Sequence, residues 1–212
     1  MQPAMTERLL AEIESEFQRY ERREHPVNFP PLPEFSVSRY ADPKFWDLEQ
    51  KFLWPRVWMI TGHVGELPEN GSYMLWDESG VPIIIVRGKD KKIRAFYNVC
   101  QHRGGPLAYQ REGKVAALTC KYHGWTYDLE GALKFVHDEH ELPGLDKSAR
   151  HLKQLRCELW GNFIFVNRDS DAPPLLDFLG PLASEFEDYR MDKRHVYAKM
   201  KFPQSSQRSC FK

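Results

Sequence analysis

The sequence lacks the features of membrane, secreted and nucleic-acid-binding proteins. Its longest apolar runs, such as residues 81–86 and 163–166, are far shorter than the roughly 20 residues that cross a bilayer. The N-terminus has no apolar run of the kind that a signal peptide needs. Lys+Arg and Asp+Glu balance at 30 each, and basic runs are no longer than residues 89–92. We therefore expect a cytoplasmic protein with neither a membrane nor a nucleic-acid partner.

Cysteine is also scarce, with 4 in 212 residues. Cys157 lies in an apolar segment and Cys210 in a polar tail, so a disulfide framework is not expected and a reducing compartment fits. The hydrophobic fraction of 42% is enough for a proper core. These values suit one medium-sized domain with appendages.

The remaining cysteines belong to a paired motif. Cys100 is followed two residues later by His102, and Cys120 three residues later by His123, with 17 residues between the halves. Each half offers one thiolate and one imidazole from a short turn, and two turns folded together supply two sulfurs and two nitrogens to a metal. Each histidine is followed by glycine within two positions, which permits tight turns and close backbone approach. The pattern predicts a metal site at Cys100, His102, Cys120 and His123.

This motif resembles the ligand signature of Rieske [2Fe–2S] proteins. The flanking words NVCQHRGGPLAYQREG and LTCKYHGWTYDLEGAL resemble the α-subunit of Rieske non-haem iron ring-hydroxylating oxygenases. The resemblance implies that Cys100 and Cys120 hold one iron of the cluster and that His102 and His123 hold the other. It also implies that a mononuclear Fe(II) site belongs to a catalytic domain beyond the Rieske segment.

Two other interpretations of the motif stay open. A structural Cys2His2 zinc site uses the same ligand types, although zinc fingers pair cysteine with cysteine and histidine with histidine. Four unrelated core residues are the other alternative. If the cluster is present, the chain lacks the cysteine pair that closes a disulfide over respiratory Rieske clusters, and we expect few hydroxyl donors. Both features place the midpoint potential at the low end of the Rieske range, about −150 to 0 mV.

Residue patterns predict a mainly β fold, an antiparallel Rieske-type β-sandwich with an N-terminal helical arm and a short C-terminal helix. A helix is expected over residues 7–23, capped by Thr6, whose apolar stripe packs on the main domain or on a partner subunit. A second helix begins with Asp42 as N-cap and Pro43 at its first position. Short segments bounded by turn residues predict strands at 57–60, 72–76, 82–87, 92–99, 115–119, 125–128, 132–135, 152–158 and 163–167. A helix over 175–189, interrupted by Pro181, and a strand over 195–202 complete the prediction.

We divide the chain into four segments. They are an N-terminal helix and proline-rich arm (1–42), the Rieske domain (43–170), a linker helix and strand leading toward an absent catalytic domain (171–202), and a polar tail that does not resemble the family (203–212). Outside the ligand motif, His137 and His140 form the only histidine cluster, and we expect it to be a solvated acidic loop. The chain is therefore expected to lack the oxygen-activating iron site and to have no catalytic acid, base or nucleophile.

The resemblance implies an oxidoreductase component that relays single electrons from a ferredoxin or flavin reductase to a mononuclear iron in aromatic hydrocarbon catabolism. It further implies a homo-oligomer for the full-length protein. The alternatives are a free-standing Rieske ferredoxin and a zinc-stabilised interaction module. The helices predicted on either side of the β segment argue against a minimal carrier.

Overall fold

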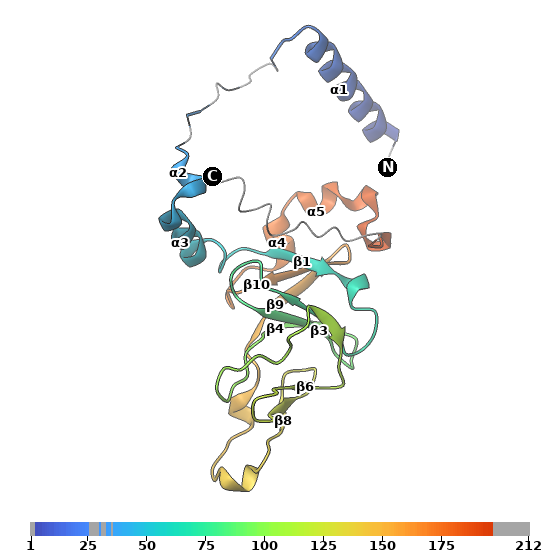
Figure 1. Cartoon of the computed structure of the whole chain (residues 1–212). Helices are drawn as coiled ribbons and strands as arrows, with labels where there is room; N and C mark the ends of the chain where they lie inside the picture. Colours follow the sequence, from blue (N-terminus) through green and yellow to red (C-terminus); the bar gives the residue numbers. More distant parts are fainter. Residues whose placement is uncertain (1–2, 26–29, 31–32, 35, 197–212) are drawn as a thin grey trace.

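Two antiparallel sheets form the body of the protein in the computed structural model, which describes residues 3–25, 30, 33–34 and 36–196. The larger sheet contains, in order, β1 (Met59–His63), β10 (Phe163–Asn167), β9 (Gln154–Trp160), β4 (Ile93–Tyr97), β3 (Ile83–Arg87), β2 (Ser72–Trp76) and β5 (Glu112–Lys114). The smaller sheet contains β6 (Leu118–Thr119), β7 (Thr126–Tyr127) and β8 (Leu133–Phe135). The smaller sheet lies at the end of the body opposite the helices (Figure 1). The predicted fold class is confirmed.

Strand β3 is buried on both faces. Ile84 and Val86 join a core cluster that extends to the smaller sheet, whereas Ile83 and Ile85 join a second cluster on the other face. Alternate side chains of a strand point to opposite faces, so a strand covered on both sides needs an unbroken apolar run. The run at 83–86 therefore marks the centre of the domain.

The helices and turns surround this body. The helices are α1 (Pro3–Glu21), α2 (Ser38–Ala41), α3 (Pro43–Phe52), α4 (Leu175–Leu179) and α5 (Leu182–Glu185). Short 3-10 turns are η1 (Val64–Glu66), η2 (Glu139–Glu141), η3 (Ser148–Arg150), η4 (Glu187–Tyr189) and η5 (Met191–Lys193). No helix in the described part of the chain is both long and apolar enough to cross a membrane.

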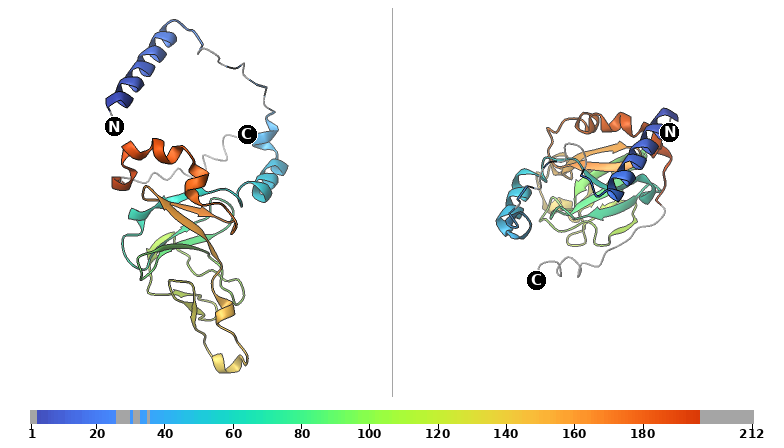
Figure 2. Two further views of the ribbon diagram at one scale, coloured as in Figure 1. Left: turned by 180° about the vertical axis from the view of Figure 1, so that it is seen from behind. Right: turned by 90° about the horizontal axis from the view of Figure 1, so that it is seen from above.

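The predicted start of α3 is confirmed, and that of α1 is wrong. The Asp42 side chain accepts from Lys44 N at 2.9 Å, with Pro43 in the first turn, as the sequence indicates. Helix α1 already begins at Pro3, so Thr6 lies inside it. Its apolar stripe is exposed, with Phe17 64% and Tyr20 84% accessible, and the helix stands apart from the sheets (Figures 1 and 2). The expected packing of that stripe on the main domain is absent among the described residues.

Several other element boundaries differ from the prediction. Strand β5 was not predicted, because Glu112–Lys114 is an exposed edge segment without apolar alternation. The strand expected over 115–119 is confined to Leu118–Thr119, and β1 extends to His63. The helical segment at the C-terminal side divides at Pro181 as predicted. The strand predicted over 195–202 falls largely on residues 197–202, outside the described part of the chain.

Candidate metal centre

The two halves of the cysteine–histidine motif fold into two loops with one backbone pattern. The first loop, residues 100–105, follows β4, and the second, residues 120–125, connects β6 to β7. In the first loop Cys100 N donates to Gly105 O at 2.8 Å, and Gly104 N donates to Cys100 O at 3.0 Å. In the second, Cys120 N donates to Trp125 O at 2.9 Å, and Gly124 N donates to Cys120 O at 3.0 Å. Equivalent hydrogen bonds therefore hold both cysteines at the base of their turns.

Glycine closes each turn for a backbone reason. Gly104 has a φ of 75° and Gly124 a φ of 72°, both in the left-handed region that side chains with a Cβ rarely adopt. A Cβ at Gly104 would meet no atom within 4 Å. This glycine is therefore required by its backbone conformation and not by a close neighbour.

The two thiols lie close together in the hydrophobic core. Cys100 is 2% and Cys120 3% exposed, and both belong to the cluster formed with the inner face of the larger sheet. A Cβ at Gly105 would lie 3.2 Å from Cys120 Sγ, so the first loop passes directly over the second thiol. Burial raises the pKa of Cys100 because a thiolate is poorly solvated there. A positively charged metal centre between the two sulfurs would compensate that desolvation.

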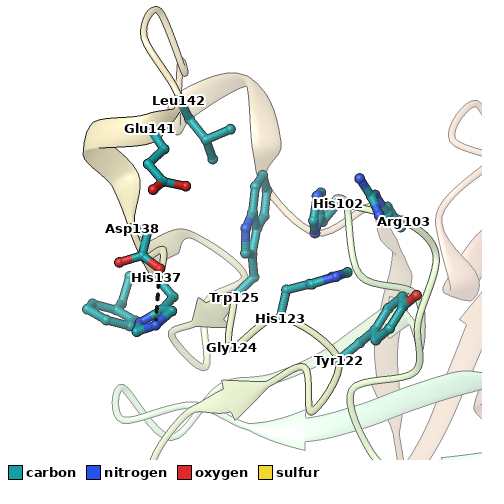
Figure 3. A pocket seen from close by; sticks show the side chains of 11 residues that line it. His102, Arg103, Tyr122, His123, Gly124, Trp125, His137, Asp138, Glu141 and Leu142 are labelled. Carbon is teal, nitrogen blue, oxygen red and sulfur yellow. Dashed lines mark ion pairs between the residues drawn. The ribbon is translucent and has the colours of Figure 1, made fainter.

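The two imidazoles lie beside each other at the mouth of the site (Figure 3). Their ring centroids are 4.6 Å apart, with 66° between the planes of His102 and His123. Trp125 stacks on His102 with a centroid distance of 4.8 Å and an interplanar angle of 7°. Tyr122 lies against His123 at 3.9 Å and is 65% exposed. The imidazole pair therefore borders the surface, next to a hollow of about 590 Å3.

His102 has a ring nitrogen that could coordinate a metal. Its Nδ1 is buried and has no hydrogen-bond partner. Burial, and then the nearby charges of His123 and Arg103, lower the pKa of His102. A neutral imidazole with a buried, unused nitrogen is the form that coordinates a metal. The residues present therefore fit the metal group that the motif predicts.

The arrangement suits a centre with two metal ions. Thiols form one pair and imidazoles another, and each iron of a two-iron Rieske cluster takes two protein ligands. Within the described residues no three His, Cys, Asp or Glu side chains form a group that could hold one metal ion. A two-iron cluster needs no such group, because its bridging sulfides complete each iron's coordination.

Tyr127 is a site residue that the sequence motif does not include. Its side chain is fully buried, and its hydroxyl lies 3.4 Å from Cys100 Sγ while accepting from Gln101 N at 3.1 Å. Burial, and then the hydrogen bond to Cys100, raise the pKa of Tyr127, so the hydroxyl keeps its proton. Among the described residues this is the one hydroxyl within hydrogen-bonding distance of either sulfur, and the expectation of few hydroxyl donors did not include it. The signal was the tyrosine's place four residues after His123, on the strand that leaves the second loop.

The histidine cluster at 137–140 lies on an exposed loop that forms one wall of the hollow (Figure 3). His137 Nε2 pairs with Asp138 Oδ2 at 3.2 Å, and both side chains are more than half exposed. The loop is solvated, as predicted.

The described cysteines form no disulfide. Free thiols are present at Cys100, Cys120 and Cys157, and Cys210 lies outside the described residues.

Comparison with known proteins assigns the family. The model of the Rieske [2Fe-2S] domain matches residues 57–169. The glycine betaine monooxygenase oxygenase subunit of Chromohalobacter salexigens is 38% identical over 159 residues, which cover 75% of this chain and 36% of that protein. Biphenyl dioxygenase subunit alpha of Metapseudomonas furukawaii is 35% identical over 162 residues, covering 73% of this chain and 35% of that protein. The chain thus spans about a third of the length of these curated relatives.

Solved structures give the same assignment. A quaternary ammonium Rieske monooxygenase in complex with L-carnitine has a TM-score of 0.68 and 32% identity, covering 73% of this chain and 44% of that one. A naphthalene 1,2-dioxygenase has a TM-score of 0.66 and 35% identity, covering 70% of this chain and 34% of that one. Such homologues are non-haem iron oxygenases with a mononuclear iron in their catalytic domain. The chain therefore belongs to the Rieske [2Fe–2S] family as a relative of Rieske oxygenase α subunits, with a domain that binds a [2Fe–2S] cluster.

Proposed function

We propose that this chain is the electron-transfer part of a Rieske oxygenase, with Cys100 and Cys120 on one iron and His102 and His123 on the other. The observation that carries the proposal is the arrangement of two loops with one hydrogen-bond pattern. It places two buried thiols on one side of the site and two imidazoles on the other. When bound, the cluster accepts and releases one electron at a time. The protein holds it and sets its surroundings.

The residues of the chain divide this work. Cys100 and Cys120 lie in the core, where apolar neighbours exclude water from the sulfurs. His102 and His123 lie at the surface beside the hollow, so electrons enter and leave on the imidazole side. Tyr127 donates its hydroxyl hydrogen to the Cys100 thiolate and thereby favours the more electron-rich, reduced state.

The partners follow from this role. We propose a ferredoxin or a flavin reductase as the electron donor and a mononuclear iron outside residues 1–212 as the acceptor, in a cytoplasmic homo-oligomer. Relatives are named for glycine betaine and carnitine as well as for biphenyl. The aromatic catabolism that the sequence analysis expected therefore fits only some of them. We propose that the oxygenated substrate is either a quaternary amine or an aromatic compound.

The cluster assignment is tested by composition and spectroscopy. Aerobically purified protein should be red-brown and contain two irons and two acid-labile sulfides per chain. After reduction, electron paramagnetic resonance should show the low average g-value of a centre with mixed nitrogen and sulfur ligands. Stoichiometric zinc without labile sulfide would instead establish the zinc interpretation of the same four residues.

The electron-transfer role is tested separately. The chain is mixed with a ferredoxin–reductase pair and reducing equivalents, and bleaching of its visible absorption is followed with and without glycine betaine, carnitine or biphenyl. We expect the cluster to be reduced and no product to form from this polypeptide alone. Product formation with substrate-dependent oxygen consumption would contradict the assignment of the oxygen-activating iron to residues outside this chain.

A further inference from the structure

A second hollow, of about 320 Å3, lies where β9 meets the end of β10. Arg156, Glu158, Arg168 and Ser170 provide most of its polar lining. None of these residues borders the hollow beside the two imidazoles. The proposed electron-transfer function uses none of them.

Arg168 is the unexplained residue of this hollow. Its Nε and Nη1 atoms are buried, and among the residues that the structure describes no nitrogen of its guanidinium has a hydrogen-bond or ion-pair partner. Other partly covered arginines are engaged. Arg94 donates to both carboxylate oxygens of Asp90, at 2.9 and 2.8 Å, and Arg87 donates to Leu67 O and Lys91 O. A guanidinium stays charged at any pH at which the protein is folded, so Arg168 cannot lose its charge to reduce the cost of its burial.

The carboxylates closest to Arg168 in the hollow and in sequence are used elsewhere. Glu158 Oε1 accepts from Arg156 Nη2 at 2.7 Å, and Glu158 Oε2 accepts from Leu175 N at 2.9 Å. Asp169 Oδ1 accepts from Asp171 N at 2.9 Å. The charged lining therefore contains two guanidinium groups and one carboxylate whose oxygens are both occupied. A positive charge and a set of unused donors remain.

We propose that this hollow binds a small oxyanion, a carboxylate or a phosphate, through the guanidinium of Arg168. The planar fork of an arginine matches two oxygens of such an anion once the side chain turns its buried Nε and Nη1 toward the hollow, and charge-assisted hydrogen bonds of this kind are about twice as strong as neutral ones. The volume lies at the lower end of the range for small-molecule sites, which fits an anion with a short organic body. Ser170 Oγ, now 3.4 Å from Asp171 Oδ1, can turn to donate to the same ligand.

The test compares unfolding temperatures of the cluster-loaded chain in sodium phosphate, sodium acetate and sodium chloride at equal ionic strength. The wild-type protein should show a saturable rise in at least one of the two oxyanion buffers relative to chloride. Arg168→Gln should raise the dissociation constant for the oxyanion by about tenfold or more, which is the loss of affinity expected for one charged hydrogen-bonded pair. Arg168→Lys should also raise this dissociation constant, because lysine keeps the charge and lacks the planar fork of donors.

Arg111→Gln removes an exposed arginine outside the hollow and serves as the matched control; it should respond to oxyanions as the wild type does. Arg168→Gln should be no less stable than the wild type in chloride, which separates binding from packing, and its visible spectrum reports that the domain is intact. Equal unfolding temperatures of the wild type in all three salts would overturn the proposal. So would an Arg168→Gln protein that keeps the full response.

Discussion

The two ligand loops have the same backbone hydrogen-bond pattern and differ in the side chains that each presents to the other. In both, the cysteine N–H donates to the carbonyl of the fifth residue on, and the fourth residue is a glycine with positive φ. The histidine is the second residue after Cys100 but the third after Cys120. The fifth is Gly105 in one loop and Trp125 in the other. One loop therefore leaves room for the neighbouring thiol, and the other supplies an indole that covers the neighbouring imidazole. The shared hydrogen-bond pattern positions the two sulfurs, and the different fifth residues determine how the two loops pack against each other.

The largest expected effect comes from removing either thiol. Cys100→Ala and Cys120→Ala should each abolish the cluster, because the iron held by the two sulfurs then keeps one protein ligand. Visible absorption and sulfide content of the purified variants measure the loss. Cys157→Ala is the matched control. Burial raises the pKa of Cys157 to about 12, so it stays a thiol, and it lies outside both loops. Loss of the cluster in that control would break the comparison.

The second effect compares the aromatic residues of the second loop. Trp125 is buried against His102, whereas Tyr122 is 65% exposed. Trp125→Ala should lower the free energy of unfolding by about 3–5 kcal/mol, the usual cost of emptying a large buried site. Tyr122→Ala should change it by about 0.5 kcal/mol or less. Urea unfolding of both variants gives the two values, and similar losses would show that the stack on His102 contributes little.

Two glycines of the first loop distinguish backbone strain from crowding. Gly104→Ala should cost about 1–2 kcal/mol for the left-handed conformation alone and leave the cluster spectrum unchanged, since no atom lies near the added Cβ. Gly105→Ala adds a Cβ 3.2 Å from Cys120 Sγ and should alter the visible spectrum of the cluster. Unfolding and absorption are measured on both. A changed cluster spectrum in Gly104→Ala with an unchanged one in Gly105→Ala would refute the close passage of the first loop over Cys120.

The smallest expected effect comes from a hydroxyl group that lies beside the thiol of the first loop and not beside that of the second. Tyr127 lies within hydrogen-bonding reach of Cys100 Sγ, and the described residues supply no hydroxyl to Cys120. Tyr127→Phe removes a bond that stabilises the reduced cluster, so the midpoint potential should fall by roughly 20–65 mV, the one-electron equivalent of about 0.5–1.5 kcal/mol. Protein-film voltammetry of wild type and variant gives the shift. Thr119→Val, which removes a surface hydroxyl in the same small sheet, is the control and should leave the potential unchanged.

The local parts of the fold could be predicted because short-range chemistry decides them. Asp42 and Pro43 specify the start of α3 through a side-chain cap and a fixed φ, and neither depends on distant residues. Strands β2 and β10 follow from β-branched and aromatic runs between turn residues. Strand β5 escaped prediction because its three exposed residues become a strand only through pairing with β2. The free surface of α1 could not be predicted either, since periodicity shows an apolar stripe but not what covers it.

The sequence by itself determined the proposed ligand set: two Cys–His pairs with glycines in the turns that follow, which predict two sulfurs and two nitrogens for one centre. Only the tertiary structure decided what surrounds them. Tyr127, 27 residues from Cys100, reaches its sulfur because β7 packs beside the first loop, and Trp125 covers His102 because the two loops face each other. Arg168 likewise looks like an ordinary charged residue in the sequence. Its lack of a partner appears only when β9 and β10 close around it, because burial and hydrogen bonding are properties of the assembled sheet.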